Sequence, residues 1–392
     1  MLTSIALIFL TGLLLGTLFQ KLKLPSLLGM IIAGLILSPY ALNLIDTSIL
    51  NISADLRRIA LVIILTRAGL SLDLNDLKKV GRPAVLMCFL PACFEIVGTI
   101  LLAPHFLGVT VLEAAILGST LAAVSPAVVV QRMIRLMEEG YGKEHSLPQL
   151  ILAGASVDDV FVIVVFTGLT SLAATGELAV GNFLQIPVSI ISGVIVGIVT
   201  GLLLIWLFKK FHMRDSVKIV IIISISFLLL ELETRLEGIL PMSGLLAIMS
   251  LGIMIKQKYD VLAVRLSSKY NKLWVAAEIM LFVLVGATVD LKYAISAGIV
   301  AVCIVCGAMI FRMAGVWLCL FKTKLTGKVK TFCMVAYTPK ATVQAAIGSI
   351  PLTMGLPCGQ MVLTVAVLSI LITAPFGAVC IDNLYKKLLV KN

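Results

Sequence analysis

Two adjacent carboxylates, Asp158 and Asp159, stand inside a long apolar stretch of the sequence, from about residue 147 to 173. An ionised side chain at membrane depth is costly, so such residues usually mark a path for ions or protons. Neighbouring positions on a helix are about 100° apart, so the two carboxylates need not face the same way. One can bind an ion while a cation holds the other. A hard oxygen ligand that exchanges a proton for a metal cation is the minimum chemistry of an antiporter.

Three further charged residues, Glu95, Arg312 and Lys340, also interrupt apolar stretches. Glu95 and Arg312 occupy equivalent positions of two sequence repeats, so we expect them to approach each other as a buried ion pair. Arginine keeps its proton at any relevant pH, which makes Arg312 a fixed charge. Lys340 is expected either to neutralise Asp158 or Asp159 or to exchange a proton itself.

Two pairs of a hydroxyl residue and a proline, Ser125-Pro126 and Thr338-Pro339, fall in the middle of apolar segments. A proline inside a helix removes one backbone hydrogen bond and clashes with the preceding turn. The paired placement predicts two discontinuous helices. Their half-helix ends and free carbonyls would surround one cavity, as in transporters that hold ions at the membrane midplane.

The elements that must position these residues are membrane-spanning helices. The chain has 392 residues, 60% of them hydrophobic and 13% charged, which excludes an ordinary soluble domain. Apolar runs such as 160–164 and 219–230 lack the alternation of a β-barrel. Since one span takes about 20 residues, we predict an all-α polytopic membrane protein of about thirteen spans, near 2–19, 25–44, 55–72, 83–103, 110–133, 147–173, 183–208, 217–232, 239–256, 272–290, 295–321, 328–350 and 360–385.

The net charge of +11 follows from these spans rather than from nucleic-acid binding. One alternate set of loops holds 24 of the 31 basic residues, and the other set holds four. Cytoplasmic loops collect Lys and Arg, so the N-terminus is expected outside and the C-terminus in the cytoplasm.

The two halves of the sequence resemble each other in three places. Residues 24–25 match 240–241, residues 69–74 match 286–291, and residues 125–131 match 338–344, at offsets of 213 to 217 positions. This offset covers seven spans, an odd number, so the second repeat is expected to be inverted in the membrane. Inverted repeats are typical of alternating-access transporters.

The sequence has no phosphate-binding loop, no dinucleotide-binding glycine motif and no His-Glu-x-x-His zinc motif. We therefore expect no cofactor and no enzymatic activity, and transport driven by ion gradients.

Four runs of residues, 123–130, 139–142, 154–159 and 339–346, resemble those of NHA-type sodium/proton antiporters of the monovalent cation:proton antiporter superfamily. The resemblance covers nearly the whole chain. It implies two crossing discontinuous helices and a homodimer. It also implies a core ion-transport domain (83–173 and 295–392), a dimerisation domain (1–72 and 217–290) and a linker helix (183–208).

The resemblance also implies roles for individual residues. Asp159 would bind the cation and the proton in turn, with Ser125 beside it in the unwound crossover. Asp158, Lys340, Glu95 and Arg312 would be supporting charges. Electrogenic members of the superfamily carry a lysine where this chain has Arg312, so one-for-one exchange and two protons per cation both stay open.

We expect a secondary antiporter in the plasma membrane that exchanges Na⁺ or Li⁺, with K⁺ as a further candidate, for H⁺. The alternative is a sodium-coupled symporter of a small organic anion, for which the sequence offers no cluster of substrate-binding polar residues. A passive channel would show flux without proton coupling. An intramembrane aspartyl protease is disfavoured, because adjacent aspartates on one helix do not readily share a water molecule.

Overall fold

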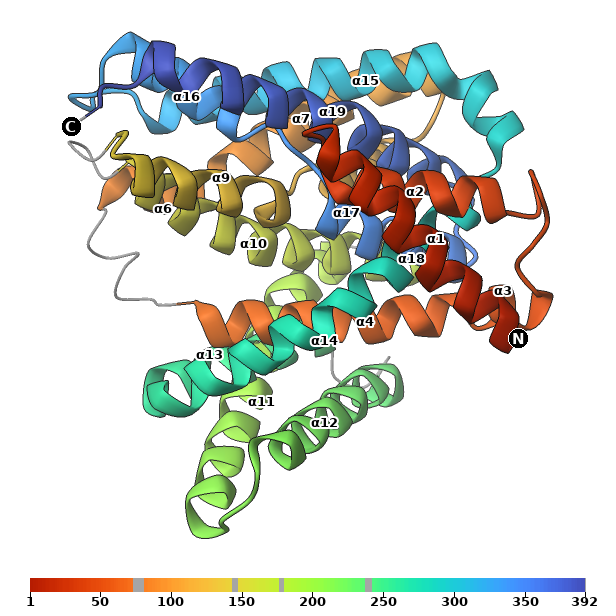
Figure 1. The fold of residues 1–392 in the computed structure, drawn as a ribbon, viewed down its shortest axis with the longest axis vertical. Helices are drawn as coiled ribbons and strands as arrows, with labels where there is room; N and C mark the ends of the chain where they lie inside the picture. Colours follow the sequence, from red (N-terminus) through yellow and green to blue (C-terminus); the bar gives the residue numbers. More distant parts are fainter. Residues whose placement is uncertain (73–80, 143–146, 176–179, 237–241, 392) are drawn as a thin grey trace. The chain divides into compact units, whose positions relative to one another are not determined.

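The computed structural model describes residues 1–72, 81–142, 147–175, 180–236 and 242–391, and its regular secondary structure there is helical apart from one isolated bridge between Tyr141 and Lys391 (Figure 1). The helices are α1 (Leu2–Lys21), α2 (Ser26–Leu37), α3 (Thr47–Asn51), α4 (Ser53–Ser71), α6 (Arg82–Met87), α7 (Leu90–Leu107), α8 (Val111–Leu121), α9 (Pro126–Glu139), α10 (Leu147–Thr175), α11 (Val180–Lys210), α12 (Asp215–Leu236), α13 (Gly244–Lys258), α14 (Asp260–Ala287), α15 (Leu291–Cys319), α16 (Gly327–Ala336), α17 (Thr342–Ile347), α18 (Ile350–Thr353) and α19 (Gly359–Leu388).

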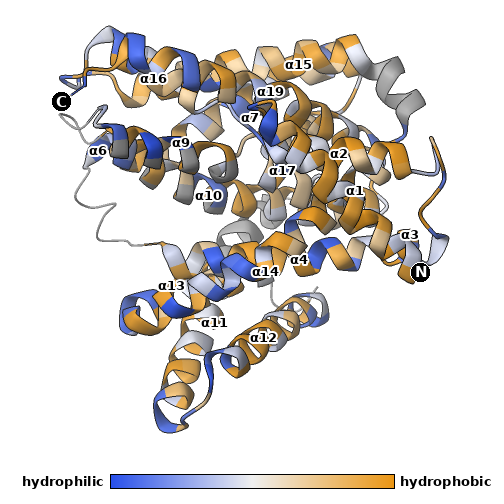
Figure 2. Cartoon of the chain, in the orientation of Figure 1, coloured by the Kyte–Doolittle hydropathy of each residue, from blue (hydrophilic) through white to orange (hydrophobic). Residues whose placement is uncertain are grey.

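Seven of the described helices are long and apolar enough to cross a membrane. Figure 2 shows apolar residues along most of these helices, with hydrophilic residues concentrated at ends such as the turn between α11 and α12. The seven segments are Leu2–Lys21, Arg82–Leu107, Leu147–Ala174, Ile191–Lys210, Asp260–Ala287, Gly298–Cys319 and Gly359–Leu388. The chain is thus an all-helical polytopic membrane protein, and the total of thirteen spans stays a prediction.

Prolines explain where two predicted spans differ from the observed helices. The span expected over 25–44 is helical in α2 only as far as Leu37, because Ser38 precedes Pro39 and a residue before proline disfavours the helical conformation. The span expected over 83–103 is interrupted between Met87 and Leu90, since the ring of Pro91 would clash with the preceding turn of a continuous helix.

The helices are interrupted at the two hydroxyl-proline pairs. Helix α8 ends at Leu121 and α9 begins at Pro126, which leaves residues 122–125 extended or irregular; we call these residues the first crossover. Helix α16 ends at Ala336 and α17 begins at Thr342, and residues 337–341 form the second crossover. A proline suits the first position of a helix, where its missing N–H has no intrahelical partner in any case.

The described chain divides into two compact units. The first unit comprises Met1–Ala54, Asn75–Val162 and Ile279–Asn392, and the second comprises Asp55–Leu74 and Ile163–Glu278. Both crossovers and all of the predicted site residues belong to the first unit. The assignment of segments to a core and a dimerisation domain stays a prediction, as does the inverted repeat, of which residues 73–74 and 240–241 lie outside the described residues.

Helices α7 and α15 pack side by side in the first unit, and they carry Glu95 and Arg312 (Figure 1). The close approach depends on glycines. A Cβ atom on Gly98 would lie 2.5 Å from the ring of Phe311, and one on Gly315 would lie 2.9 Å from the backbone of Pro91. Small residues of this kind let membrane helices approach closely.

In the second unit, glycines spaced four residues apart on α11 face α13. A Cβ atom on Gly193 or Gly197 would lie within 2.5 Å of the carbonyl oxygens of Ser243 or Ala247. Small residues of this kind allow the two helices to approach closely.

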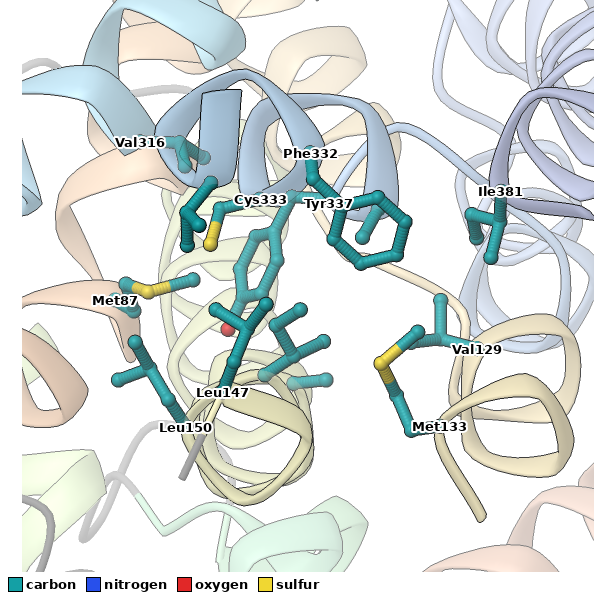
Figure 3. Packing of buried hydrophobic residues seen from close by; sticks show 14 of the residues in the cluster. Met87, Val129, Met133, Leu147, Leu150, Val316, Phe332, Cys333, Tyr337 and Ile381 are labelled. Atoms are coloured by element: carbon teal, nitrogen blue, oxygen red, sulfur yellow. The ribbon is translucent and has the colours of Figure 1, made fainter. Parts of the chain in front are cut away.

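An apolar cluster lies beside the second crossover and joins α6, α9, α10, α15, α16 and α19. Figure 3 shows the ring of Tyr337 inside this cluster, pointing from the end of α16 toward the helix that carries Leu147 and Leu150. The ring needs the space left by Gly154 on α10, where a Cβ atom would collide with the tyrosine hydroxyl. The cluster therefore fixes the start of the second crossover against the helix that carries the two aspartates.

Candidate functional site

Arg312 is fully buried and joins Glu95 and Asp158 to both crossovers. Its Nη2 lies 2.7 Å from Asp158 Oδ2, and its Nη1 lies 3.0 Å from Glu95 Oε2. The Nε donates to the carbonyl of Tyr337 at 2.7 Å, and Nη1 also donates to the carbonyl of Ala122. A guanidinium suits this role because its donors form a rigid planar fork.

Lys340 extends this set of charges from the second crossover. Its Nζ lies 2.5 Å from Glu95 Oε1 and donates to the carbonyl of Leu121 at 2.5 Å. Glu95 thus contacts both cations, and we call Glu95, Asp158, Arg312 and Lys340 the charged network. Two carboxylates and two cations sum to zero, which suits buried groups that must be paired.

The structure changes one expected pairing. Arg312 holds Asp158, whereas the ion pair of Lys340 is with Glu95 rather than with either aspartate. The reason is local: Lys340 Nζ is held at the end of α8, which packs on the helix that carries Glu95.

The backbone groups of the first crossover are held by hydrogen bonds. The carbonyls of residues 121–123 accept bonds from buried side chains, and the N–H groups of residues 124 and 125 donate. The partners are Lys340 and Gln344 for Leu121, Arg312 for Ala122, Gln344 for Ala123, Asp158 for Val124 and the Pro339 carbonyl for Ser125. The sequence predicts free carbonyls at this helix break, but those of residues 121–123 are engaged in this structure.

The two aspartates have different surroundings. Asp158 Oδ2 accepts hydrogen bonds from Arg312 and from the Val124 N–H, at 2.7 and 2.9 Å. Asp159 has no ion pair in the described part of the chain, and its Oδ1 is buried without a hydrogen-bond partner although the residue as a whole is partly exposed. Asp158 Oδ1 is likewise buried without a hydrogen-bond partner among the described residues, but Asp158 is ion-paired and fully buried. The carboxylate of Asp159 is therefore the more accessible of the two to a ligand.

Ser125 contributes a second available oxygen. The residue is fully buried, and its Oγ has no hydrogen-bond partner among the described residues. Its backbone N–H is 2.7 Å from the carbonyl of Pro339, so the two crossovers contact each other at this residue. Thr338, in the equivalent position, instead donates its hydroxyl to the Val335 carbonyl at 2.8 Å.

Sequence reasoning missed three residues that the structure places in this site. The carbonyl of Tyr337 accepts a hydrogen bond from Arg312, and Thr373 Oγ1 accepts the backbone N–H of Lys340 at 3.0 Å. Gln344 donates to the carbonyl of Leu121 at the end of α8 and to that of Ala123 in the first crossover. Gln344 carried a usable signal, since it is an uncharged polar residue at a repeat position inside an apolar segment.

The available donors are carboxylate and hydroxyl oxygens, which suit a hard cation or a proton. In the described ranges there is no group of three His, Cys, Asp or Glu side chains that could hold a metal ion. A bound alkali cation would be transported cargo at this site rather than a resident cofactor.

Comparisons with known proteins agree on one family for this chain. Residues 5–386 match the family model described as "Sodium/hydrogen exchanger, transmembrane". Sodium/hydrogen exchanger 9B2 of Homo sapiens is 35% identical over 384 residues, which cover 94% of this chain and 70% of that protein. Sodium/hydrogen exchanger 9B1 of Homo sapiens is 30% identical over 386 residues, which cover 94% of this chain and 73% of that protein.

The fold has a solved counterpart. The structure of the sodium proton antiporter MjNhaP1 from Methanocaldococcus jannaschii at pH 8 superimposes with a TM-score of 0.85 over 98% of this chain and 97% of that one. The two sequences are 19% identical, so this likeness concerns the fold alone.

Proposed function

Because the chain belongs to the sodium/hydrogen exchanger family, we propose that it exchanges Na⁺ or Li⁺, with K⁺ as a further candidate, for H⁺, and that cation and proton compete for Asp159. The observation that carries this proposal is the contrast between the aspartates. Asp158 is ion-paired with Arg312 through Oδ2, whereas Asp159 has no ion pair among the described residues. Each aspartate also has one buried oxygen, Oδ1, without a hydrogen-bond partner in that part of the chain. A buried polar atom without a partner costs free energy, so a ligand that completes it is favoured.

Charge balance supplies the coupling. The charged network is neutral as long as Lys340 keeps its proton, so an empty, ionised Asp159 leaves the site with one negative charge. One Na⁺ or one H⁺ makes it neutral. A charged site is costly to move across the apolar layer, so only the loaded site crosses. This balance supports one-for-one exchange, and exchange of two protons per cation would require Lys340 to release a proton as well.

Alternating access requires one part of the protein to move against another. We assign the moving core to residues 83–173 and 295–392, and the fixed homodimeric part to residues 1–72 and 217–290, with 183–208 as the linker. The concentration of Lys and Arg in one alternate set of loops supports a plasma-membrane orientation with the N-terminus outside and the C-terminus in the cytoplasm.

The test is cation-driven pH change inside proteoliposomes, with Na⁺, Li⁺ and K⁺ added in turn. Wild type is expected to show a cation-dependent pH change that Asp159→Asn abolishes. Asp260→Asn is the matched control, because Asp260 is an exposed residue that pairs with Lys256 at the start of α14. A folded wild-type protein that gives no pH change with any of the three cations contradicts the proposal and favours the sodium-coupled organic-anion symporter.

A further inference from the structure

The uncharged side chain of Gln344 makes three hydrogen bonds to backbone groups. The Nε2 donates to the carbonyls of Leu121 and Ala123 at 3.1 and 2.8 Å, and the Oε1 accepts the Ala341 N–H at 2.9 Å. An amide has two N–H donors, and both are used here. The residue is 1% exposed, so water does not compete for these bonds.

The bond to Ala123 falls on a particular peptide group. The carbonyl of Ala123 and the N–H of Val124 belong to one planar peptide unit. Gln344 holds the carbonyl side of this unit, and Asp158 Oδ2 holds its N–H side. A single peptide plane therefore connects α17, which follows the second crossover, to the aspartate pair.

Ser125 follows this peptide directly, and Asp159 follows Asp158. Rotation of the plane would turn Val124 and shift the Ser125 hydroxyl relative to the Asp159 carboxylate. Lys340 shares the Leu121 carbonyl with Gln344, but among the described contacts Gln344 supplies the donor to Ala123.

We propose that Gln344 is a positioning residue for the cation site, which fixes the Ala123–Val124 peptide so that Ser125 and Asp159 present their oxygens to one ion. This inference rests on the proposed function, because it assumes that the ion binds at Asp159. Gln344 itself does not contact the ion. It acts by holding the backbone in place before the ion arrives, and binding sites gain affinity when their groups are held ready in this way.

The test is the KM for the transported cation in Gln344→Met, which keeps the length of the side chain and removes both donors and the acceptor. We expect the KM to rise about tenfold, since loss of one or two buried hydrogen bonds corresponds to about this factor. The maximal rate should stay within about twofold of wild type. Gln360→Met is the matched control, because Gln360 stands at the start of α19 and is not part of the site.

Gln344→Asn is the second variant. It keeps the amide but is one methylene shorter, so it should raise the KM in the same direction by less. An unchanged KM with a lower maximal rate or a lower melting temperature overturns the proposal and leaves Gln344 a purely structural residue, as does failure of both variants to fold. If wild type itself shows no cation-driven pH change, the proposed function fails, and that result is distinct from a failure of the Gln344 proposal.

Discussion

Equivalent hydroxyl-proline pairs lie at the two crossovers, but the crossovers differ in their contacts. The first crossover has no charged residue, and its backbone is held by side chains from α10, α15 and α17. The second crossover carries Lys340, supplies the Tyr337 carbonyl to Arg312 and supplies the Pro339 carbonyl to Ser125. The second crossover thus contributes a charge and carbonyl groups to its surroundings, whereas the first is held mainly by side chains from neighbouring helices.

The hydroxyl groups show the same difference. The Thr338 hydroxyl is used internally, on the Val335 carbonyl, whereas the buried Ser125 hydroxyl has no hydrogen-bond partner in the described ranges. Sequence symmetry between repeats therefore does not imply equal roles. We expect an ion to take its hydroxyl ligand from Ser125 at the first crossover. The charged residues that hold this crossover, Asp158 and Arg312, lie outside it.

The largest effect is expected from Arg312, which holds both crossovers. Arg312→Met leaves Glu95 and Asp158 with fewer partners, and removing one partner of a buried ion pair typically lowers the free energy of unfolding by about 3–5 kcal/mol. Arg312→Lys keeps the charge but lacks the planar fork that reaches Asp158, Glu95 and Tyr337 together. We expect both variants to lose transport. Thermal unfolding in detergent should show Arg312→Lys to be more stable than Arg312→Met but less stable than wild type. Equal melting temperatures for Arg312→Met and wild type would contradict the view that Arg312 holds Glu95, Asp158 and the two crossovers together.

A smaller effect is expected from Lys340. Each of its partners has a second contact, since Arg312 also binds Glu95 and Gln344 also binds the Leu121 carbonyl. Lys340→Met should lower the free energy of unfolding by about 2 kcal/mol, in the range of a hydrogen bond to a charged group. Electrical measurements in proteoliposomes test its role in coupling. Electroneutral exchange in wild type would support the role of Lys340 as a fixed charge. A wild-type transport current that Lys340→Met abolishes would instead make Lys340 a proton carrier.

Substitution of the two hydroxyl residues tests the asymmetry directly. Ser125→Ala removes a buried hydroxyl that has no hydrogen-bond partner among the described residues, so stability should not fall, while the KM for the cation should rise several-fold. Thr338→Val removes a bond to the Val335 carbonyl and should cost about 1 kcal/mol of stability without changing the KM. The reverse pattern, with KM altered in Thr338→Val and unaltered in Ser125→Ala, would assign the ligand to the second crossover.

An effect on stability alone is expected at Thr373, which supports the second crossover from α19. Thr373→Val keeps the shape of the side chain but leaves the backbone N–H of Lys340 without its acceptor. The melting temperature should fall by an amount that corresponds to about 1–3 kcal/mol. Cation KM is expected to stay at the wild-type value, and a change in KM larger than that of Ser125→Ala would show that the second crossover also shapes the ion site.

The sequence could predict the helical membrane class, the charged residues of the site and the two helix breaks. Charged residues and prolines inside apolar segments are conspicuous in such a chain. It could also bring Glu95 and Arg312 together from their equivalent repeat positions, and the structure places them 3.0 Å apart. It could not predict the partner of Lys340 or the carbonyls that Gln344 holds. Those contacts depend on how two non-helical segments lie in space, and no periodicity in the sequence encodes that geometry.

The proposed exchange depends on competition between cation and proton for Asp159. The most direct measurement of this competition is proton release from purified protein in weakly buffered detergent solution when Na⁺ or Li⁺ is added. Wild type is expected to release protons in proportion to the cation bound, and Asp159→Asn is expected to release none. Cation binding without proton release in wild type, or release that persists in Asp159→Asn, would contradict the proposed competition.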